Sequence, residues 1–203
     1  MKIELLYITP NAERLIERIG RLSHKSEDRI TRESYKDFIL KLIQMGHESV
    51  LEHAFASFLI SGVSRALTHQ LVRHRLASYT QKSQRYTKET KFKYVTPETI
   101  EKKEEAKLCF TSFMEYCQVV YNRLIELGIP KEDARYVLPN ATETEIVVTM
   151  NFRELRHVIK ERGSKKAQWE IRQLVIEMLK ILKQKAPTVF QDFEIKDNYV
   201  ELK

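Results

Sequence analysis

Glycine is scarce in this chain, and its positions limit the folds that the sequence can adopt. The 203 residues include only five glycines, at positions 20, 46, 62, 128 and 163. A dinucleotide-binding βαβ fold needs the G-x-G-x-x-G pattern, and a P-loop fold needs G-x-x-x-x-G-K-[ST]. Neither pattern can be written with glycines so far apart. Any site for a phosphate-bearing ligand must therefore be built from side chains.

Hydrophobic periodicity predicts strands and helices in an order without a βαβ rhythm. Apolar stretches predict strands at residues 2–8, 54–63 and 143–152. Helical spacing and helix-ending glycines predict helices at 12–22, 31–45, 64–75, 98–127, 130–137 and about 167–185. This mixture favours an α+β fold with a small, largely antiparallel sheet packed with helices. We expect a single domain over residues 1–203, because this length supports one substantial core.

We expect no targeting or membrane-spanning segment from this sequence. Its first apolar piece is short, carries charge and stops at Pro10, and no other stretch approaches the ~20 apolar residues of a membrane span. Cys109 and Cys117 lie eight residues apart in a predicted helix, with no C-x-x-C pair, and we expect both to be core residues. The expected compartment is the reducing cytoplasm, with no membrane partner.

Basic residues concentrate in one window, residues 73–93. This window holds seven lysines and arginines against Glu89 alone, a net charge of +6, whereas the remaining 28 basic and 27 acidic residues nearly cancel. A concentrated window favours a localised anion site over a nonspecific nucleic-acid coat. Phosphate-bearing small molecules are therefore expected ligands.

The window begins with Arg73-His74-Arg75 and continues through a polar segment. If the chain is extended after Ser78, the side chains of Gln81, Ser83 and Arg85 project to one side. An amide matches a pyrimidine edge, and a guanidinium is the best bidentate partner for phosphate. A nucleoside monophosphate would satisfy all three side chains. The alternative is that cations at the end of helix 64–75 only stabilise its dipole.

Other catalytic constellations are weak. His47 and His53 would lie about 240° apart on a helix, unlike the H-E-x-x-H pair, so we expect no metal site. No G-x-S-x-G elbow surrounds Ser83 or any neighbouring serine. Arg153 and His157 lie four residues apart, on one face if helical, and an ordinary polar helix surface is the alternative there.

Arg73-His74-Arg75, followed after seven residues by Ser83, resembles the R-H-R-x7-S signature of the flavin-dependent thymidylate synthases, the thymidylate synthase-complementing family. The resemblance runs from about residue 23 to residue 187. It includes Gly46-His47-Glu48-Ser49, Ala134 to Pro139, Asn151-Phe152-Arg153, and Arg162 followed by Ala167-Gln168-Trp169-Glu170. Thr80-Gln81 and Gln84 depart from the Asn-Glu and Gly of many members.

The resemblance implies a homotetramer with FAD in sites shared between subunits. It also implies reductive methylation of dUMP to dTMP, with 5,10-methylenetetrahydrofolate as carbon donor, NADPH as reductant and no cysteine nucleophile. Matching positions imply FAD contacts from Ser23, His53, Arg73, His74, Arg75, Asn151, Arg153 and His157. They imply dUMP contacts from Gln70, Arg73, Gln81, Ser83, Arg85, Arg135 and Arg162.

Within that set, we expect Arg162 to be catalytic, because a fixed cation beside the pyrimidine stabilises developing charge. Ser83 has no base beside it in the sequence and is expected to bind the substrate rather than attack it.

Two other functions remain open from the sequence. A single-stranded nucleic-acid module would use the cations of residues 73–93, with Tyr79, Tyr86, Phe92 and Tyr94 as stacking platforms. A flavin protein of the same fold that has lost methyl transfer is the second alternative, which the neutral Gln81 suggests.

Overall fold

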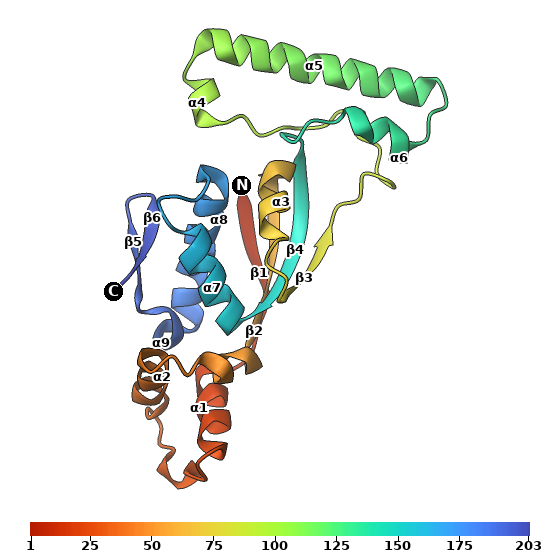
Figure 1. Ribbon diagram of the computed structural model, residues 1–203. Helices are drawn as coiled ribbons and strands as arrows, with labels where there is room; N and C mark the ends of the chain where they lie inside the picture. The colour runs from red at the N-terminus through yellow and green to blue at the C-terminus, as the bar shows by residue number, and fades with distance from the viewer. The chain divides into compact units, whose positions relative to one another are not determined.

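The computed structural model describes all residues, 1–203, and mixes helices with two small sheets (Figure 1). The larger sheet has the order β1 (Lys2–Ile8), β2 (Phe55–Ser64), β4 (Glu143–Asn151) and β3 (Ala77–Gln81). The smaller sheet is an antiparallel hairpin of β5 (Phe193–Lys196) and β6 (Tyr199–Leu202), which pairs Phe193 with Leu202. The predicted α+β class, with a small antiparallel sheet packed against helices, is confirmed.

The chain divides into two compact units. Unit one comprises residues 1–2, 60–69 and 80–146, and unit two comprises residues 3–59, 70–79 and 147–203. All four strands of the larger sheet contribute residues to both units. The single domain expected over residues 1–203 stays a prediction.

Unit one is organised by a long helix over a small aromatic core. Its helices are α4 (Glu98–Glu101), α5 (Glu104–Glu126), α6 (Lys131–Ala134), the 3-10 helix η3 (Arg135–Val137) and most of α3 (Arg65–Leu71). Helix α5 packs against α4, α6 and η3. Phe92, Met114 and Cys117 form the buried core, with Tyr94 and Phe110 packed against it. The helix predicted over residues 98–127 is present as α4 and α5, which are separated where the backbone of Lys103 adopts an extended conformation.

The two cysteines differ in their surroundings. Cys117 is buried as predicted, and burial raises the pKa of its thiol. Cys109 is exposed on the same helix, so the expectation that it would be a core residue is wrong. The two positions are about 80° apart around α5, enough to place one at the core and the other at its solvent margin.

Unit two contains most of the helices. They are α1 (Ala12–Leu22), η1 (Glu27–Arg29), α2 (Tyr35–Gln44), η2 (Glu48–His53), α7 (Phe152–Arg162), α8 (Trp169–Lys185) and α9 (Pro187–Phe190). Helix α7 packs against η2, α8 and β6, and the buried rings of Phe152 and Phe190 meet edge to face at 5.4 Å. No helix in the chain has both the length and the apolar character needed to cross a membrane.

Two helices are shorter in the structure than the sequence predicts. The helix expected at 31–45 begins at Tyr35, because the Ser34 hydroxyl accepts the Thr31 backbone N–H and donates to Glu17. The helix expected at 64–75 ends at Leu71. There the Tyr79 hydroxyl contacts the carbonyl oxygens of Leu71 and His74, each at 2.8 Å, in place of a further helical turn.

A buried arginine joins the segments of unit two around α7. The Arg156 guanidinium donates to both carboxylate oxygens of Asp192, at 2.6 and 2.7 Å, and to the carbonyl of Val189. Its Nε donates to Glu48 at 3.2 Å, and the group lies over the Phe193 ring. Burial alone would lower the pKa of Arg156, but the two carboxylates more than offset it and raise the pKa.

We predict that Asp192→Ala destabilises the protein by about 3 kcal/mol, because it leaves a buried guanidinium without its bidentate partner. Urea unfolding followed by circular dichroism measures the change. The matched control is Glu177→Ala, which breaks the exposed pair with Lys180 and should cost less than about 1 kcal/mol. Equal losses in the two variants would contradict the structural role of Arg156.

Candidate functional site

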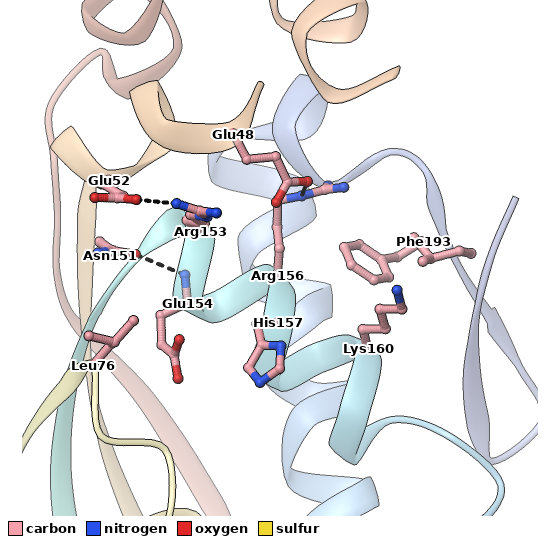
Figure 2. A pocket seen from close by; sticks show the side chains of 11 residues that line it. Glu48, Glu52, Leu76, Asn151, Arg153, Glu154, Arg156, His157, Lys160 and Phe193 are labelled. Atoms are coloured by element: carbon pink, nitrogen blue, oxygen red, sulfur yellow. Dashed lines mark hydrogen bonds and ion pairs between the residues drawn. The ribbon is translucent and has the colours of Figure 1, made fainter. Parts of the chain in front are cut away.

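A hollow of about 580 Å³ lies in unit two, along the exposed side of α7 (Figure 2). It is lined by Glu48, Glu52, Leu76, Asn151, Arg153, Glu154, Arg156, His157, Lys160, Phe193 and Leu202. Three of the residues implied to contact FAD belong to this set. Its size, and a lining that mixes apolar with polar side chains, are compatible with a small-molecule site.

The start of α7 places these three residues. Asn151 is the N-cap, and its Oδ1 accepts the backbone N–H of Glu154 at 2.8 Å. From this fixed start, helical spacing puts Arg153, His157 and Lys160 on one exposed stripe. The sequence also allowed Arg153 and His157 to be part of an ordinary polar helix surface. That description is incomplete, because Arg153, His157 and Lys160 all line the hollow.

Carboxylates neutralise part of this stripe. Arg153 donates to Glu52 at 2.5 Å, a pair drawn in Figure 2, while Arg156, which is buried beside the stripe, is held by Glu48 and Asp192. None of the ion pairs in the structure includes Lys160. An anionic or electron-rich ligand in the hollow would therefore contact the ammonium group of Lys160, near the C-terminal end of α7.

A second hollow of about 800 Å³ lies in the same unit and shares Arg153 and Glu48 with the first. Ser23, another residue implied to contact FAD, lines it, and its hydroxyl donates to the Gly20 carbonyl at 2.9 Å. Its lining also includes Arg21, Arg29, Lys41, His24 and His47. This excess of cationic side chains suits a phosphate-bearing ligand.

His74 is buried, and its ring nitrogens face two charged residues. Arg162 Nε donates to His74 Nε2 at 2.9 Å, while Glu154 Oε1 lies 3.6 Å from Nδ1. The His157 ring lies edge-on at 5.7 Å. Burial, then the Arg162 charge, then His157 lower the pKa of His74 from 6.5 to about 4, so the imidazole is neutral near pH 7.

In unit one, two arginines implied to contact dUMP share one partner. Arg85 Nε donates to the Glu132 carboxylate at 2.9 Å, and Arg135 Nε donates to the Glu132 backbone carbonyl at 3.0 Å. The fold thus brings together two cations that are 50 positions apart in the sequence. Both Arg85 and Glu132 are about half exposed, so a stronger anion can compete for Arg85.

A third arginine adds to the positive charge of this region. Arg65 is the first residue of α3, and its Nη1 is buried without a hydrogen-bond partner. Burial and the nearby charge of Arg135 lower the pKa of Arg65. Two guanidinium groups close enough to repel each other favour binding of an anion beside them.

The expected shared face of Gln81, Ser83 and Arg85 is wrong. Strand β3 ends at Gln81, and a turn follows in which the Ser83 hydroxyl accepts the Arg85 backbone N–H at 3.2 Å. Alternation along a strand therefore does not continue to Arg85. The Gln81 amide nitrogen donates to the hydroxyls of Thr68 and Thr144, which leaves its carbonyl oxygen as an acceptor.

Most of the expected stacking platforms are not free. Phe92 is 9% exposed, and Tyr94 packs between Phe92 and Phe110. The Tyr79 hydroxyl is engaged with backbone carbonyls, and burial raises its pKa. Tyr86 alone of the four is largely exposed. The structure therefore gives the nucleic-acid alternative little stacking surface.

The other residues implied by the resemblance lie outside both hollows. His53 ends η2, Gln70 lies in the last turn of α3, and Arg73 and Arg75 are exposed in the turn after α3. The implied dUMP residues Gln81, Ser83, Arg85 and Arg135 belong to unit one, while Gln70, Arg73 and Arg162 belong to unit two. Their joint role in one site stays a prediction.

Several polar residues around these positions were not foreseen from the sequence. They are Glu132, Glu154, Arg156, Lys160 and Asp192. One signal was present, because Asn151 with Glu154 three residues later has the spacing of a capping box, which marks a helix start. Nothing local to Glu132 or Asp192 indicates their partners, which lie 47 and 36 residues away.

Comparison with known proteins identifies the class of this α+β chain. The family model "Thymidylate synthase complementing protein" matches residues 4–188. The chain belongs to this family.

Relatives with the printed name flavin-dependent thymidylate synthase agree. The protein of Geobacter sulfurreducens is 46% identical over 200 residues, 95% of this chain and 86% of the relative. The protein of Clostridium tetani is 40% identical over 94% of this chain and 86% of the relative. The protein of Pyrococcus furiosus is 43% identical over 81% of this chain and 69% of the relative.

The low pKa of His74 predicts a pH dependence of stability. The unfolded chain binds more protons between pH 6.5 and about 4, so the stability from this group is complete above pH 6.5 and is lost as the pH falls through that window. The loss from this group is up to about 3 kcal/mol. Urea unfolding at several pH values should show a shallower decline for His74→Gln than for the wild type. Parallel declines would contradict the assignment to His74.

Proposed function

We propose that this protein is a flavin-dependent thymidylate synthase that converts dUMP to dTMP. It uses FAD, takes the carbon from 5,10-methylenetetrahydrofolate and takes reducing equivalents from NADPH. The observation that carries the proposal is the family match across residues 4–188, with relatives of that name covering most of the chain. Cationic side chains in unit one and the two hollows of unit two also support it.

The cations of unit one suit the phosphate of dUMP. Arg85 and Arg135 already converge on Glu132, and a dianionic phosphate is a stronger partner for a guanidinium than one exposed carboxylate. The carbonyl oxygen of Gln81 can accept a pyrimidine N–H, so the departure from the usual acidic residue retains an acceptor. This retained acceptor favours methyl transfer over a flavin protein that has lost it.

The hollows of unit two fit FAD. They share Arg153 and Glu48, and their linings contain Ser23, Asn151 and His157, so one elongated ligand can follow both. The cations of the second hollow suit a diphosphate, and the helix α7 stripe suits a ring system. When bound, reduced FAD supplies the hydride that completes the transferred methyl group.

The residues of the chain have separate tasks in this proposal. Arg162 polarises the pyrimidine, since its Nη groups have no partner in the structure while its Nε is fixed by His74. Ser83 contacts the substrate rather than attacking it, because its hydroxyl oxygen accepts the Arg85 backbone N–H in a turn and no base activates it. Cys117 is no nucleophile, because burial raises the pKa of its thiol and so lowers the thiolate fraction.

The homotetramer, the sites shared between subunits and the cytoplasmic location belong to the same proposal. They are implied by the family resemblance, as are the folate and NADPH partners.

Visible absorption of the purified protein with added FAD, before and after dUMP, tests the function. We expect flavin bands that shift when dUMP is added, and dTMP formation when methylenetetrahydrofolate and NADPH follow. A protein that takes up no FAD but binds single-stranded DNA in a salt-dependent way would overturn the proposal in favour of the nucleic-acid alternative. Flavin uptake and dUMP binding without dTMP would support the non-methylating alternative.

Substitutions at Arg85 and at its carboxylate partner Glu132 should change the affinity for dUMP in opposite directions. We predict that Arg85→Ala raises the Kd for dUMP about tenfold or more, because a charge-assisted hydrogen bond is lost. Glu132→Gln should lower the Kd up to about fivefold, because it removes the competing carboxylate. Calorimetric titration of the FAD-loaded protein measures both, with Arg123→Ala, in an exposed pair with Glu126, as the unchanged control. A higher Kd for Glu132→Gln would refute the competition.

A further inference from the structure

Arg162, the residue expected to act on the pyrimidine, has only one side-chain partner, His74. Arg162 Nε–H donates to His74 Nε2 at 2.9 Å. A neutral imidazole carries a single ring proton, so a ring whose Nε2 accepts must carry its proton on Nδ1. The orientation of the Arg162 fork thus depends on which nitrogen of His74 is protonated.

Glu154 faces the nitrogen that carries this proton. Its Oε1 lies 3.6 Å from Nδ1, slightly beyond a direct hydrogen bond, and both side chains are 7% exposed. A carboxylate on that side favours the Nδ1–H form by attraction to the N–H dipole. In the other form, an Nε2–H would point at the Arg162 donor, and both donors would lose an acceptor.

The backbones of Glu154 and His74 are themselves held in place by hydrogen bonds. The Glu154 backbone N–H is fixed by the Asn151 cap at 2.8 Å. The Tyr79 hydroxyl holds the His74 carbonyl at 2.8 Å. In Figure 2 the Glu154 carboxylate points away from the Glu52–Arg153 pair, so that pair does not engage it.

We propose that Glu154 and His74 are positioning residues for Arg162, in which Glu154 keeps the His74 proton on Nδ1 and His74 Nε2 orients the guanidinium. The proposal rests on the proposed function and assigns His74 a task other than flavin contact. The charged and titratable groups around the ring are Arg162, Glu154, His157 and Glu161. Of these, only Glu154 is a carboxylate facing Nδ1 at ion-pair distance.

The tautomer can be read without any activity measurement. Nitrogen NMR of the full-length protein labelled with ¹⁵N-histidine, at pH 7, distinguishes Nδ1–H from Nε2–H, and the signal lost in His74→Gln assigns His74. We expect the Nδ1–H form in the wild type and a mixture of both forms in Glu154→Ala. An Nε2–H form in the wild type, or an unchanged ring in Glu154→Ala, would overturn the proposal.

Steady-state kinetics with dUMP tests the consequence for Arg162. Glu154→Ala and His74→Leu should lower kcat about tenfold to a hundredfold, because a misplaced catalytic group loses rate steeply. The conservative variants Glu154→Gln and His74→Gln should retain more activity, since each amide oxygen can still accept a hydrogen bond. The matched control Glu177→Gln, at an exposed glutamate of α8, should leave kcat unchanged.

A double-mutant cycle separates positioning from simple structural damage. In an Arg162→Lys background, which lacks the Nε–H donor, His74→Leu should cost little further rate. Full additivity of the two losses would overturn the positioning role. A wild-type protein that forms no dTMP would refute the proposed function alone, because the NMR result still decides whether Glu154 sets the tautomer of His74.

Discussion

The buried guanidinium of Arg156 holds together the part of unit two that contains the candidate site. It joins α7 to Glu48 at the start of η2 and to Val189 and Asp192 near the C-terminal hairpin. A buried cation is costly unless nearly all its donors are satisfied, so these segments must stay in register around it. Helix α7, which presents Arg153 and His157, is fixed by this requirement.

Around this helix, several of the functional polar groups hydrogen-bond to other residues of the chain. His74 is kept neutral by burial and by Arg162, and a neutral ring is what allows Nε2 to accept from the arginine. In unit one, Arg85 and Arg135 meet at Glu132 in the same manner. Both arrangements hold cations in place by hydrogen bonds before a ligand is bound, which reduces the cost of ordering them when an anionic ligand binds.

Much of the fold was predictable from local sequence. The strands at residues 2–8 and 143–152 and the helix at 12–22 were located within a residue or so, because each is bounded by Pro, Asn or a clear change of period. The helix expected at 64–75 was too long, because its end is decided by the hydroxyl of Tyr79, which comes later in the chain. The C-terminal hairpin was missed because its two strands are only four residues each.

The sequence by itself determined the family, the basic window and the residue types available for binding, because these are properties of the order of amino acids. The tertiary structure alone decided which of those residues become partners. Arg162 meets His74 across 88 residues, and Arg156 meets Glu48 across 108. Such pairings form because polar side chains that become buried must find hydrogen-bond partners elsewhere in the folded chain. No local pattern in the sequence encodes which partners these are.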